Sequence, residues 1–366
     1  MTLKVAMIGW EYPPYKVGGL GTHCYWLTRN LADMGVSIDF YMPKTDGIRS
    51  DKKNLVFRGI GEEVFPYETV KLTGDFFEKV NRYNELCAKI HGNYDLIHCH
   101  DWLTARAGIM LKKKLGIPMI LTVHSTEYDR SGWLNPNQWF IDIEKEGMEN
   151  ADIIIAVSHY TCRVLMEKYG IPKEKIRVIH NAITSIGERG RKLKIVLFMG
   201  RLTIQKGAEF FIRVAKKVLE IEDCFFVVAG TGNILPELVD LAVSLGISNR
   251  IMFTGELTDE ELHHIYRISQ VYVLPSVSEP FGITVLEALS AGTPVIVSKS
   301  AGVSEILESC LRVDFWDVDE MANKIVALLR YKQLRKEIVK HGKEEIKFFT
   351  WMRNARKTLD VYKEVV

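Results

Sequence analysis

Short runs of apolar residues alternate with longer stretches of helical periodicity along both halves of this chain. Each apolar run is short and continuous, as in a strand that a parallel sheet buries on both faces. Strand–helix alternation predicts the α/β class, with a parallel sheet covered by helices on both sides. The first half predicts strands at Leu3–Ile8, Ser37–Tyr41, Leu96–Cys99, Met119–Val123 and Ile153–Val157, and helices near Leu20–Met34, Gly74–Ile90, Leu103–Leu115 and His159–Tyr169.

The second half restarts this pattern after Ser185–Lys192, a polar, glycine-rich segment that we interpret as a linker. Because 366 residues exceed what one hydrophobic core usually serves, we expect two domains, residues 1–184 and 193–346. Residues 347–366 predict a terminal helix with one apolar face, which packing against the first domain would bury. The strands predicted for the second domain are Ile195–Met199, Phe225–Ala229, Ile251–Thr254, Val271–Leu274 and Val295–Val297.

The stretch Leu274–Ile296 combines a strand end, a turn and a helix start, with a glutamate on each side of that start. We predict that the helix opens near Ile283, after Gly282, so that its unpaired amides and its dipole favour an anion. Glu279 before the helix and Glu287 inside it suit neutral hydroxyls. A phosphate site between two hydroxyl-binding carboxylates fits a sugar–diphosphate–ribose, although a helix with ordinary acidic N-terminal residues is the alternative.

Two cations and a glycine loop follow earlier strands of the second half. Arg201 and Lys206 come after Ile195–Met199 and suit a diphosphate whose leaving charge must be stabilised, the alternative being a solvated charge pair. Gly230 and Gly232 follow Phe225–Ala229 and resemble half of a dinucleotide-binding fingerprint, which alone carries little weight.

A second glycine-rich loop lies between the first predicted strand and its helix. Gly18, Gly19 and Gly21 would let the backbone approach a phosphate closely, and a flexible turn is the alternative. Their spacing does not match a dinucleotide fingerprint, in which the glycines follow the strand directly.

The run His98-Cys99-His100-Asp101-Trp102 offers either metal ligands or sugar-binding groups. Alternation places His98 and His100 on one face of a buried strand, and without a second cluster of ligands we disfavour a metal site. Asp101 and Trp102 at the strand end suit a sugar better, as a carboxylate for hydroxyls and an aromatic face for the ring. His124 also lies just past a strand end, where a structural and a functional role are equally open.

The overall charge and the cysteine pattern narrow the class of protein. With 48 basic and 46 acidic residues, the net charge of +2 gives no reason to expect nucleic acid or an anionic membrane as a partner. The chain has no apolar run long enough for a membrane span, and its first residues lead directly into a strand rather than a signal peptide. Its six scattered cysteines indicate a reduced, cytoplasmic protein. Its low glutamine content is typical of thermophiles. Asp317-Val318-Asp319 resembles an acid-x-acid metal motif, but we interpret it as the acidic start of a helix over Val318–Leu329.

With these motifs in place, the chain resembles the retaining glycosyltransferases of the GT-B fold, in the large family of sucrose-phosphate, trehalose and many mannosyl- and glucosyltransferases. It is also similar to archaeal glycogen synthases. The most specific part of the resemblance is Glu279-Pro280-Phe281-Gly282 with Glu287, followed by Ala291–Val295. The resemblance spans the whole chain and implies two Rossmann-like, doubly wound domains facing a cleft. It also implies that the first domain binds the acceptor and the second the nucleotide sugar.

The resemblance further assigns roles to residues of the second domain. Arg201 and Lys206 would contact the diphosphate, and Glu287 would bind the ribose hydroxyls. The transferred sugar would be held by Glu279 and by the backbone of Phe281, Gly282 and Ile283. The base would be surrounded by Gly230, Gly232 and the turn that contains Leu257.

In the first domain, the resemblance implies that Gly18 and Gly19 close over the phosphates, while Asp101 and His124 line the reaction centre. We therefore expect a hexosyltransferase, moving glucose or another hexose to a saccharide or other hydroxyl acceptor with retention. We expect no cofactor and no metal, with the departing diphosphate as the base. A sugar-nucleotide epimerase and a non-catalytic nucleotide-binding protein are the alternatives.

Overall fold

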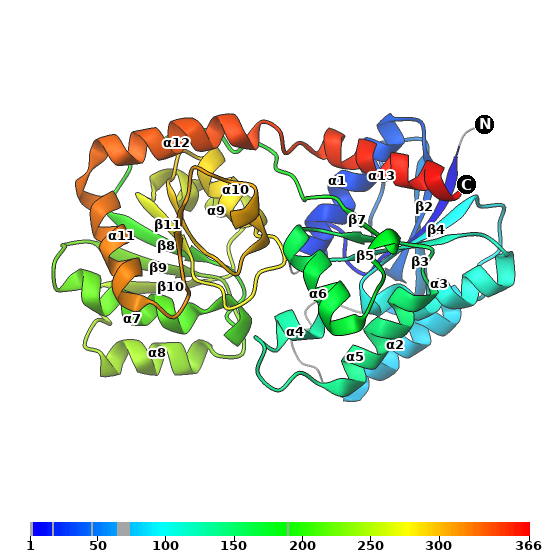
Figure 1. The fold of residues 1–366 in the computed structure, drawn as a ribbon, viewed down its shortest axis with the longest axis horizontal. Coiled ribbons are helices and arrows are strands. Elements are labelled where there is room, and N and C mark those ends of the chain that lie inside the picture. The colour runs from blue at the N-terminus through cyan, green and yellow to red at the C-terminus, as the bar shows by residue number, and fades with distance from the viewer. Residues whose placement is uncertain (1–2, 17, 45–46, 64–73, 189) are drawn as a thin grey trace. The chain divides into compact units, whose positions relative to one another are not determined.

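The computed structural model describes residues 3–16, 18–44, 47–63, 74–188 and 190–366. Two sequence predictions fall partly outside this range, the start of the chain at Met1 and the linker at Arg189. The chain forms two compact units (Figure 1). Unit 1 comprises Met1–Glu127, Pro136–Asn181 and Trp351–Val366, and unit 2 comprises Tyr128–Asn135 and Ala182–Thr350.

Unit 1 is built on a seven-stranded sheet in the order β3-β2-β1-β4-β5-β6-β7, and all of its strand pairs are parallel. The five predicted strands of this half are present. The strands are β1 (Lys4–Ile8), β2 (Ser37–Lys44), β3 (Leu55–Glu63), β4 (Leu96–His100), β5 (Met119–Val123), β6 (Ile153–Ala156) and β7 (Ile176–Val178). The helices are α1 (Gly19–Asp33), α2 (Gly74–Cys87), α3 (Trp102–Leu115), α5 (Gln138–Asn150), α6 (His159–Tyr169) and α13 (Trp351–Val365), and α4 (Glu127–Arg130) runs into the first segment of unit 2.

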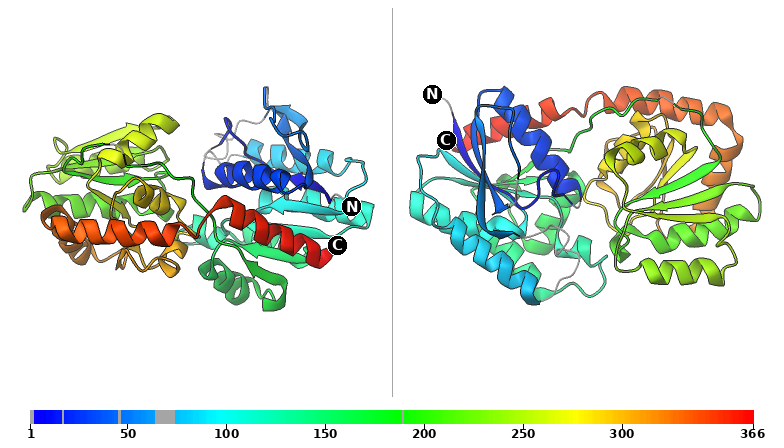
Figure 2. Two further views of the ribbon diagram at one scale, coloured as in Figure 1. Left: turned by 90° about the horizontal axis from the view of Figure 1, so that it is seen from above. Right: turned by 180° about the vertical axis from the view of Figure 1, so that it is seen from behind.

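The C-terminal helix α13 belongs to unit 1 and lies beside α1 (Figure 2). The side chains of Val5 and Met7 in β1 point toward these two helices and share a core with them. The other face of the sheet carries α2, α3 and α5, which pack against one another. The apolar face predicted for the terminal helix is fully buried in this arrangement, at Trp351, Ala355, Leu359 and Tyr362.

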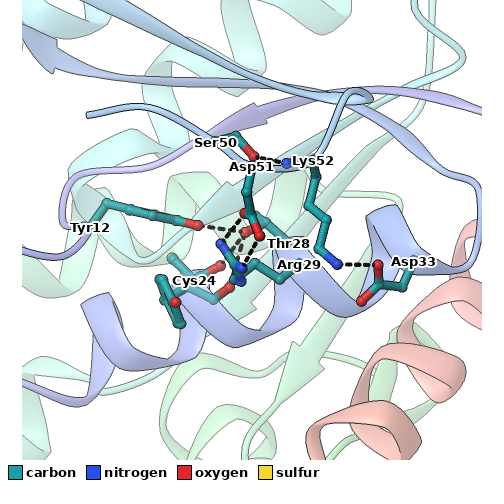
Figure 3. A network of polar contacts seen from close by, with 9 residues as sticks. Tyr12, Cys24, Thr28, Arg29, Asp33, Ser50, Asp51 and Lys52 are labelled. Carbon is teal, nitrogen blue, oxygen red and sulfur yellow. Dashed lines mark hydrogen bonds and ion pairs between the residues drawn. The ribbon is translucent and has the colours of Figure 1, made fainter. Parts of the chain in front are cut away.

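Polar contacts fix α1 against the segment that precedes β3 (Figure 3). Arg29 forms an ion pair with Asp51 across 2.6 Å, and Lys52 forms one with Asp33 across 2.5 Å. Thr28, one residue before Arg29, donates to the carbonyl oxygen of Cys24 within the same helix. These contacts hold in place the helix that follows the glycine-rich loop.

Unit 2 contains a six-stranded sheet in the order β10-β9-β8-β11-β12-β13, again with parallel pairs throughout. Its strands are β8 (Ile195–Met199), β9 (Phe225–Ala229), β10 (Ile251–Gly255), β11 (Val271–Leu274), β12 (Val295–Ser298) and β13 (Leu311–Val313). Its helices are α7 (Ala208–Leu219), α8 (Leu235–Ser244), α9 (Asp259–Ile268), α10 (Ile283–Ser290), α11 (Val318–Arg330) and α12 (Lys332–Ile346).

The unit 2 sheet is also covered on both faces. Phe198 and Phe226 of the sheet pack with Phe211 of α7 in a core to which α8 and α11 contribute. On the other side, α10 packs against α9 and α12. Both units are therefore doubly wound, as the alternating pattern predicts. In the described part of the chain, no helix has both the length and the apolar composition needed to cross a bilayer.

Candidate functional site

Each sheet has one point at which the strand order reverses. In unit 1 this point lies between β1 and β4, and in unit 2 it lies between β8 and β11. Loops diverge at such a point, so open parallel sheets bind ligands there, beyond the carboxyl ends of the strands. The predicted residues follow these strands, with Gly18 after β1, Asp101 after β4, Lys206 after β8 and Glu279 after β11.

In unit 2 the loops after β8 and β11 touch. This close approach is possible because Gly207 has no side chain. Gly207 has a φ of 66°, and a Cβ on it would lie 2.0 Å from the carbonyl oxygen of Pro275. This approach brings Lys206 to Glu279, and the ammonium donates to Glu279 Oε2 across 2.5 Å. Ser276 donates to the same oxygen across 3.3 Å. Two residues predicted to contact different parts of a donor therefore pair with each other in this structure.

The helix α10 begins where the sequence predicts, at Ile283. Gly282 at its N-cap has a φ of 105°, a conformation that other residues rarely adopt. No side chain from the described residues caps this end of the helix. Phe281 is buried before it, and Thr284 in its first turn accepts a hydrogen bond from the Tyr272 hydroxyl across 2.8 Å. The helix start thus keeps the backbone donors that suit an anion.

Glu287 lies inside α10 and is half-buried. The Tyr266 hydroxyl donates to Glu287 Oε2 across 3.0 Å. Burial raises the pKa of Tyr266 well above its usual value, so this hydroxyl remains a donor at all physiological pH values. The contact orients the Glu287 carboxylate, and no local pattern in the sequence predicts it.

Gly230 and Gly232 have a structural reason to be glycine. A Cβ on Gly230 would lie 2.1 Å from the carbonyl oxygen of Gly200, and a Cβ on Gly232 would lie 2.1 Å from that of Leu202. The loops after β8 and β9 thus run in direct backbone contact, and the Leu202 amide donates to the Thr231 carbonyl across 2.8 Å. The half-buried Arg201 projects from the same β8 loop.

The remaining predicted residues of unit 2 lie in loops or at a helix start. Leu257 is half-buried in the loop after β10, just before Thr258 caps α9. Asp317 accepts a hydrogen bond from the Glu320 amide across 2.9 Å, so the prediction that this acidic segment caps a helix is confirmed.

In unit 1 the glycine-rich loop leads directly into α1. Gly18 is the N-cap of α1 in an extended conformation, with φ of −167°. A Cβ on Gly18 would meet no described atom within 4 Å, whereas one on Gly21 would lie 2.6 Å from the Cβ of Lys16. Gly21 therefore serves the packing of the loop, while Gly18 and Gly19 are exposed.

Asp101 and His124 meet at the ends of β4 and β5. The amide of His124 donates to Asp101 Oδ1 across 2.6 Å, and the amide of Ser125 donates to it across 3.4 Å. Asp101 has a φ of 55°, a strained conformation for a residue with a side chain. Its carboxylate therefore fixes the turn that carries His124.

The expectation that Trp102 offers an aromatic face to a sugar is wrong. Trp102 is 9% exposed and begins α3. Its ring packs edge-on against Phe140 and also contacts Phe76 and Trp139. Other aromatic rings therefore surround the Trp102 ring, and Trp102 stabilises the core of unit 1.

A buried group of histidines surrounds His124, and one of its members was not singled out from the sequence. His23 in α1 places its ring 4.6 Å from that of His124, while His100 Nδ1 lies 3.1 Å from His124 Nε2. Burial lowers the pKa of His23 to about 4 and of His98 to about 3, and it holds the pKa values of His100 and His124 well below 6.5. All four imidazoles are neutral at pH 7.

Known protein families match both halves of the chain. A family model described as glycosyl transferases group 1 matches residues 182–345, and one described as glycosyltransferase family 4 matches residues 17–185. A protein of Methanocaldococcus jannaschii, described as an uncharacterized glycosyltransferase, is 32% identical over 391 residues, which cover 99% of this chain and 98% of that protein. The chain belongs to the glycosyltransferases.

The fold of this glycosyltransferase is GT-B. Sucrose-phosphate synthase from Thermosynechococcus elongatus matches 99% of this chain and 98% of its own, with a TM-score of 0.84 at 23% identity. The catalytic domain of starch synthase IV from Arabidopsis thaliana, solved with ADP and acarbose, matches 100% of this chain and 99% of its own, with a TM-score of 0.77 at 17% identity. The resemblance and the fold class predicted from the sequence are confirmed.

Proposed function

We propose that this glycosyltransferase moves a hexose from a nucleoside diphosphate sugar to a hydroxyl of a saccharide or another acceptor, with retention of configuration. The observation that carries the proposal is the convergence of Lys206, Glu279 and the uncapped start of α10 at the switch point of unit 2. A cation beside free helix amides suits a diphosphate, and an adjacent carboxylate suits the hydroxyls of a sugar.

In this proposal unit 2 binds the donor. The diphosphate lies at the start of α10 near Lys206 and Arg201, and the transferred hexose contacts Glu279 and the backbone of Phe281–Ile283. Glu287, oriented by Tyr266, accepts hydrogen bonds from the ribose. The base lies toward the β9 and β10 loops, beside Gly230, Gly232 and Leu257. The ADP bound to the catalytic domain of starch synthase IV supports a nucleotide of this kind.

The pair between Lys206 and Glu279 gives the donor a specific effect on the site. A diphosphate carries more negative charge than one carboxylate, so it competes for the Lys206 ammonium. Once Lys206 turns to the phosphate, Glu279 retains Ser276 and gains capacity to accept a sugar hydroxyl. The same ligand thus prepares both its leaving group and the contact to its sugar.

The proposed chemistry depends on the leaving group. As the bond between the sugar and the diphosphate breaks, negative charge grows on the phosphate oxygens, and Lys206, Arg201 and the α10 amides stabilise it. Retention follows when the departing diphosphate takes the proton of the acceptor hydroxyl on the face that it leaves. These cations supply the charge that a divalent ion supplies in other transferases, so we propose metal-independent transfer.

Unit 1 binds the acceptor in this proposal. Asp101 fixes the turn of His124, and the half-buried His124 presents its imidazole at the carboxyl end of β5. A neutral imidazole can donate to a sugar oxygen or accept from a hydroxyl. Gly18 and Gly19 are exposed in the loop after β1, and their backbone can approach a phosphate oxygen.

A donor panel tests the function. Purified protein is incubated with the glucose, galactose and mannose esters of UDP, ADP or GDP, with and without saccharide and polyol-phosphate acceptors. We expect one donor to release free nucleoside diphosphate only when an acceptor is present, and proton NMR of the product to show the donor's anomeric configuration. An inverted product would overturn retention, and epimerised donor without nucleotide release would indicate the epimerase instead.

A further inference from the structure

Three histidines from separate elements of unit 1 converge near the carboxyl ends of β4 and β5. His23 comes from α1, His100 ends β4, and His124 follows β5. Each imidazole offers one ring nitrogen, and these three nitrogens lie within 4.8 Å of one another. The fold therefore adds histidines from two other elements to the sequence run that lacked a second cluster of ligands.

Asn181 fixes the tautomer of His23. His23 Nδ1 lies 2.8 Å from Asn181 Oδ1, and because an amide oxygen only accepts, Nδ1 carries the ring proton. His23 Nε2 then presents a lone pair, and this buried atom has no hydrogen-bond partner among the described residues. A histidine that donates one N–H to an oxygen and keeps its other nitrogen available has the arrangement of a metal ligand.

His100 carries a second nitrogen without a partner. His100 Nδ1 contacts His124 Nε2, while His100 Nε2 is buried and unpaired within the described part of the chain. A buried polar atom without a partner destabilises the fold, and an ion would satisfy His23 Nε2, whereas His100 would bind that ion through Nδ1. Adjacent His98 is different, because its two nitrogens contact the Tyr362 hydroxyl at 2.6 Å and Thr122 Oγ1 at 2.7 Å.

We propose that His23, His100 and His124 form a binding site for a divalent transition-metal ion of the zinc class. Three neutral imidazoles and one open position make up a common zinc coordination sphere. The fourth position falls to water, because half-buried His124 leaves the cluster accessible from its side. Among divalent ions, imidazole selects the zinc class over magnesium and calcium, which prefer oxygen ligands.

The geometry requires only side-chain adjustment. Zinc–nitrogen bonds of about 2.0–2.1 Å in a tetrahedron set ligand nitrogens about 3.4 Å apart. His100 Nδ1 and His124 Nε2, at 3.1 Å, are already near that spacing. The ion would replace the proton between them, and that proton would move to the other nitrogen of the same imidazole. His124 follows its strand rather than lying within it, so its ring can turn toward the lone pair of His23.

This site goes beyond the proposed function, which uses no metal. An ion at the three histidines would take a lone pair of His124 and remove that imidazole from the acceptor side of the transfer reaction. The site is therefore expected to hold an inhibitory ion rather than a cofactor, and its existence is measured by metal binding alone.

Cobalt binding tests the site directly. Untagged protein is stripped with EDTA, exchanged into metal-free buffer at pH 7.5 and titrated with Co²⁺, whose visible absorption intensifies on four-coordinate binding. We expect one equivalent to bind with the absorption of a nitrogen-ligated site, and Zn²⁺ to displace it. Wild-type protein without such absorption at stoichiometric Co²⁺ overturns the proposal.

Three variants locate the ion. We expect His23→Asn to weaken Co²⁺ binding at least tenfold, and Asn181→Ala to weaken it about ten- to hundredfold through loss of the contact that orients His23. His341→Asn, at an exposed histidine of α12, is the matched control and should bind as wild type does. Circular dichroism in EDTA identifies any variant that does not fold. Such a variant is replaced by His124→Asn, because His124 is partly exposed. Equal affinity in a folded ligand variant and the control would contradict the assignment.

Discussion

Lys206 and Glu279 lie 73 positions apart in the chain, and their side chains form an ion pair 2.5 Å long at the switch point of unit 2. The pair is mostly buried, with 20% of the Lys206 side chain and 9% of the Glu279 side chain exposed. Each charge offsets part of the other's loss of hydration. A donor that draws Lys206 to its diphosphate must therefore supply a new partner for both groups.

Replacing Glu279 by Gln is expected to separate catalysis from nucleotide binding. In the proposed donor pose the substitution removes a carboxylate contact to the sugar that strengthens as positive charge develops, so kcat should fall about ten- to hundredfold. Lys206 loses its competing partner, so nucleoside diphosphate without the sugar should bind as tightly as to wild type, or a few fold more tightly. Steady-state kinetics and calorimetry measure the two effects, and a tenfold loss of diphosphate affinity would contradict the assignment.

Lys206→Ala should show the complementary pattern. Loss of a charge-assisted contact to phosphate costs about 1.5–3 kcal/mol, so the affinity for nucleoside diphosphate should fall at least tenfold. Lys216→Ala is the matched control, because Lys216 of α7 forms an exposed ion pair with Glu220. Calorimetry on both variants should show weakened binding only for Lys206→Ala, and equal affinities would place the diphosphate elsewhere.

Glu287→Gln is expected to act on the other end of the donor. Glu287 lies eight positions beyond Glu279 and inside α10, so in the proposed donor pose it contacts the ribose rather than the reacting sugar. If its contact is equal in the ground and transition states, the donor KM should rise about tenfold with little change in kcat. Tyr266→Phe, which removes the hydroxyl that orients Glu287, should raise KM in the same direction by less. A kcat defect without a change in KM would show that the two glutamates have exchanged roles.

The helix start at Ile283 and the strands on each side of it could be predicted because local signals agree there. Buried apolar runs mark the central strands, and Gly282 marks the position where a positive φ is needed. By contrast, β3 was missed because Leu55–Glu63 is an edge strand interrupted by two glycines and an arginine. Its pairing with β2 is a tertiary property, as is the three-residue strand β13.

The candidate residues could be selected from their positions after strands, but their mutual contacts could not. The approach of Lys206 to Glu279 depends on the fit of Gly207 against Pro275, which no local pattern encodes. His23 stands in the glycine-rich segment of the sequence, yet its meeting with His124 depends on how α1 is rotated against the sheet. The available signal was a histidine in the helix that directly follows the glycine-rich loop.

Two glycine substitutions distinguish a packing role from a ligand role. Gly230→Ala places a Cβ 2.1 Å from the Gly200 carbonyl oxygen at a φ of 125°, so it should destabilise the protein by roughly 2–5 kcal/mol. Gly18→Ala meets no described atom within 4 Å and has an extended φ, so stability should stay within about 0.5 kcal/mol of wild type.

The two variants are compared by urea unfolding and by transfer assays. If the backbone at Gly18 approaches the substrate, Gly18→Ala should lower kcat/KM at least about tenfold while unfolding as wild type does. Unchanged activity in that variant would show that the loop has no close ligand contact. A Gly230→Ala protein of wild-type stability would show that the neighbouring loops can separate.

Lys192 should make the stability of unit 2 depend on pH. Its ammonium is largely buried, near the Tyr266 and Ala291 carbonyls and the Thr293 hydroxyl, and burial lowers its pKa to about 8. Between pH 8 and 10.5 the unfolded chain binds a proton that the folded chain has released, so stability rises with pH. Below pH 8 the folded state carries the whole cost of the buried charge.

The measurement compares wild type with Lys192→Met in urea at pH 7 and at pH 10. Relative to the variant, wild type should gain about 2 kcal/mol over this interval. Lys194→Met removes an exposed lysine two positions away and should leave the pH dependence of wild type unchanged. A constant difference between wild type and Lys192→Met across the interval would show that Lys192 titrates as it does in water.

Removal of divalent ions should leave the transfer reaction intact. In the proposed mechanism, Lys206, Arg201 and the α10 amides supply positive charge where the leaving diphosphate develops negative charge, so the reaction should not require a metal. We expect the rate in excess EDTA to stay within about twofold of the rate in magnesium, since screening by free ions changes exposed contacts only modestly. Added Zn²⁺ should lower the rate by capturing His124, and EDTA should restore it. Transfer that stops in EDTA and returns with magnesium or manganese would contradict the cationic mechanism. If activity is lost in EDTA and only zinc restores it, the three histidines form a catalytic metal site.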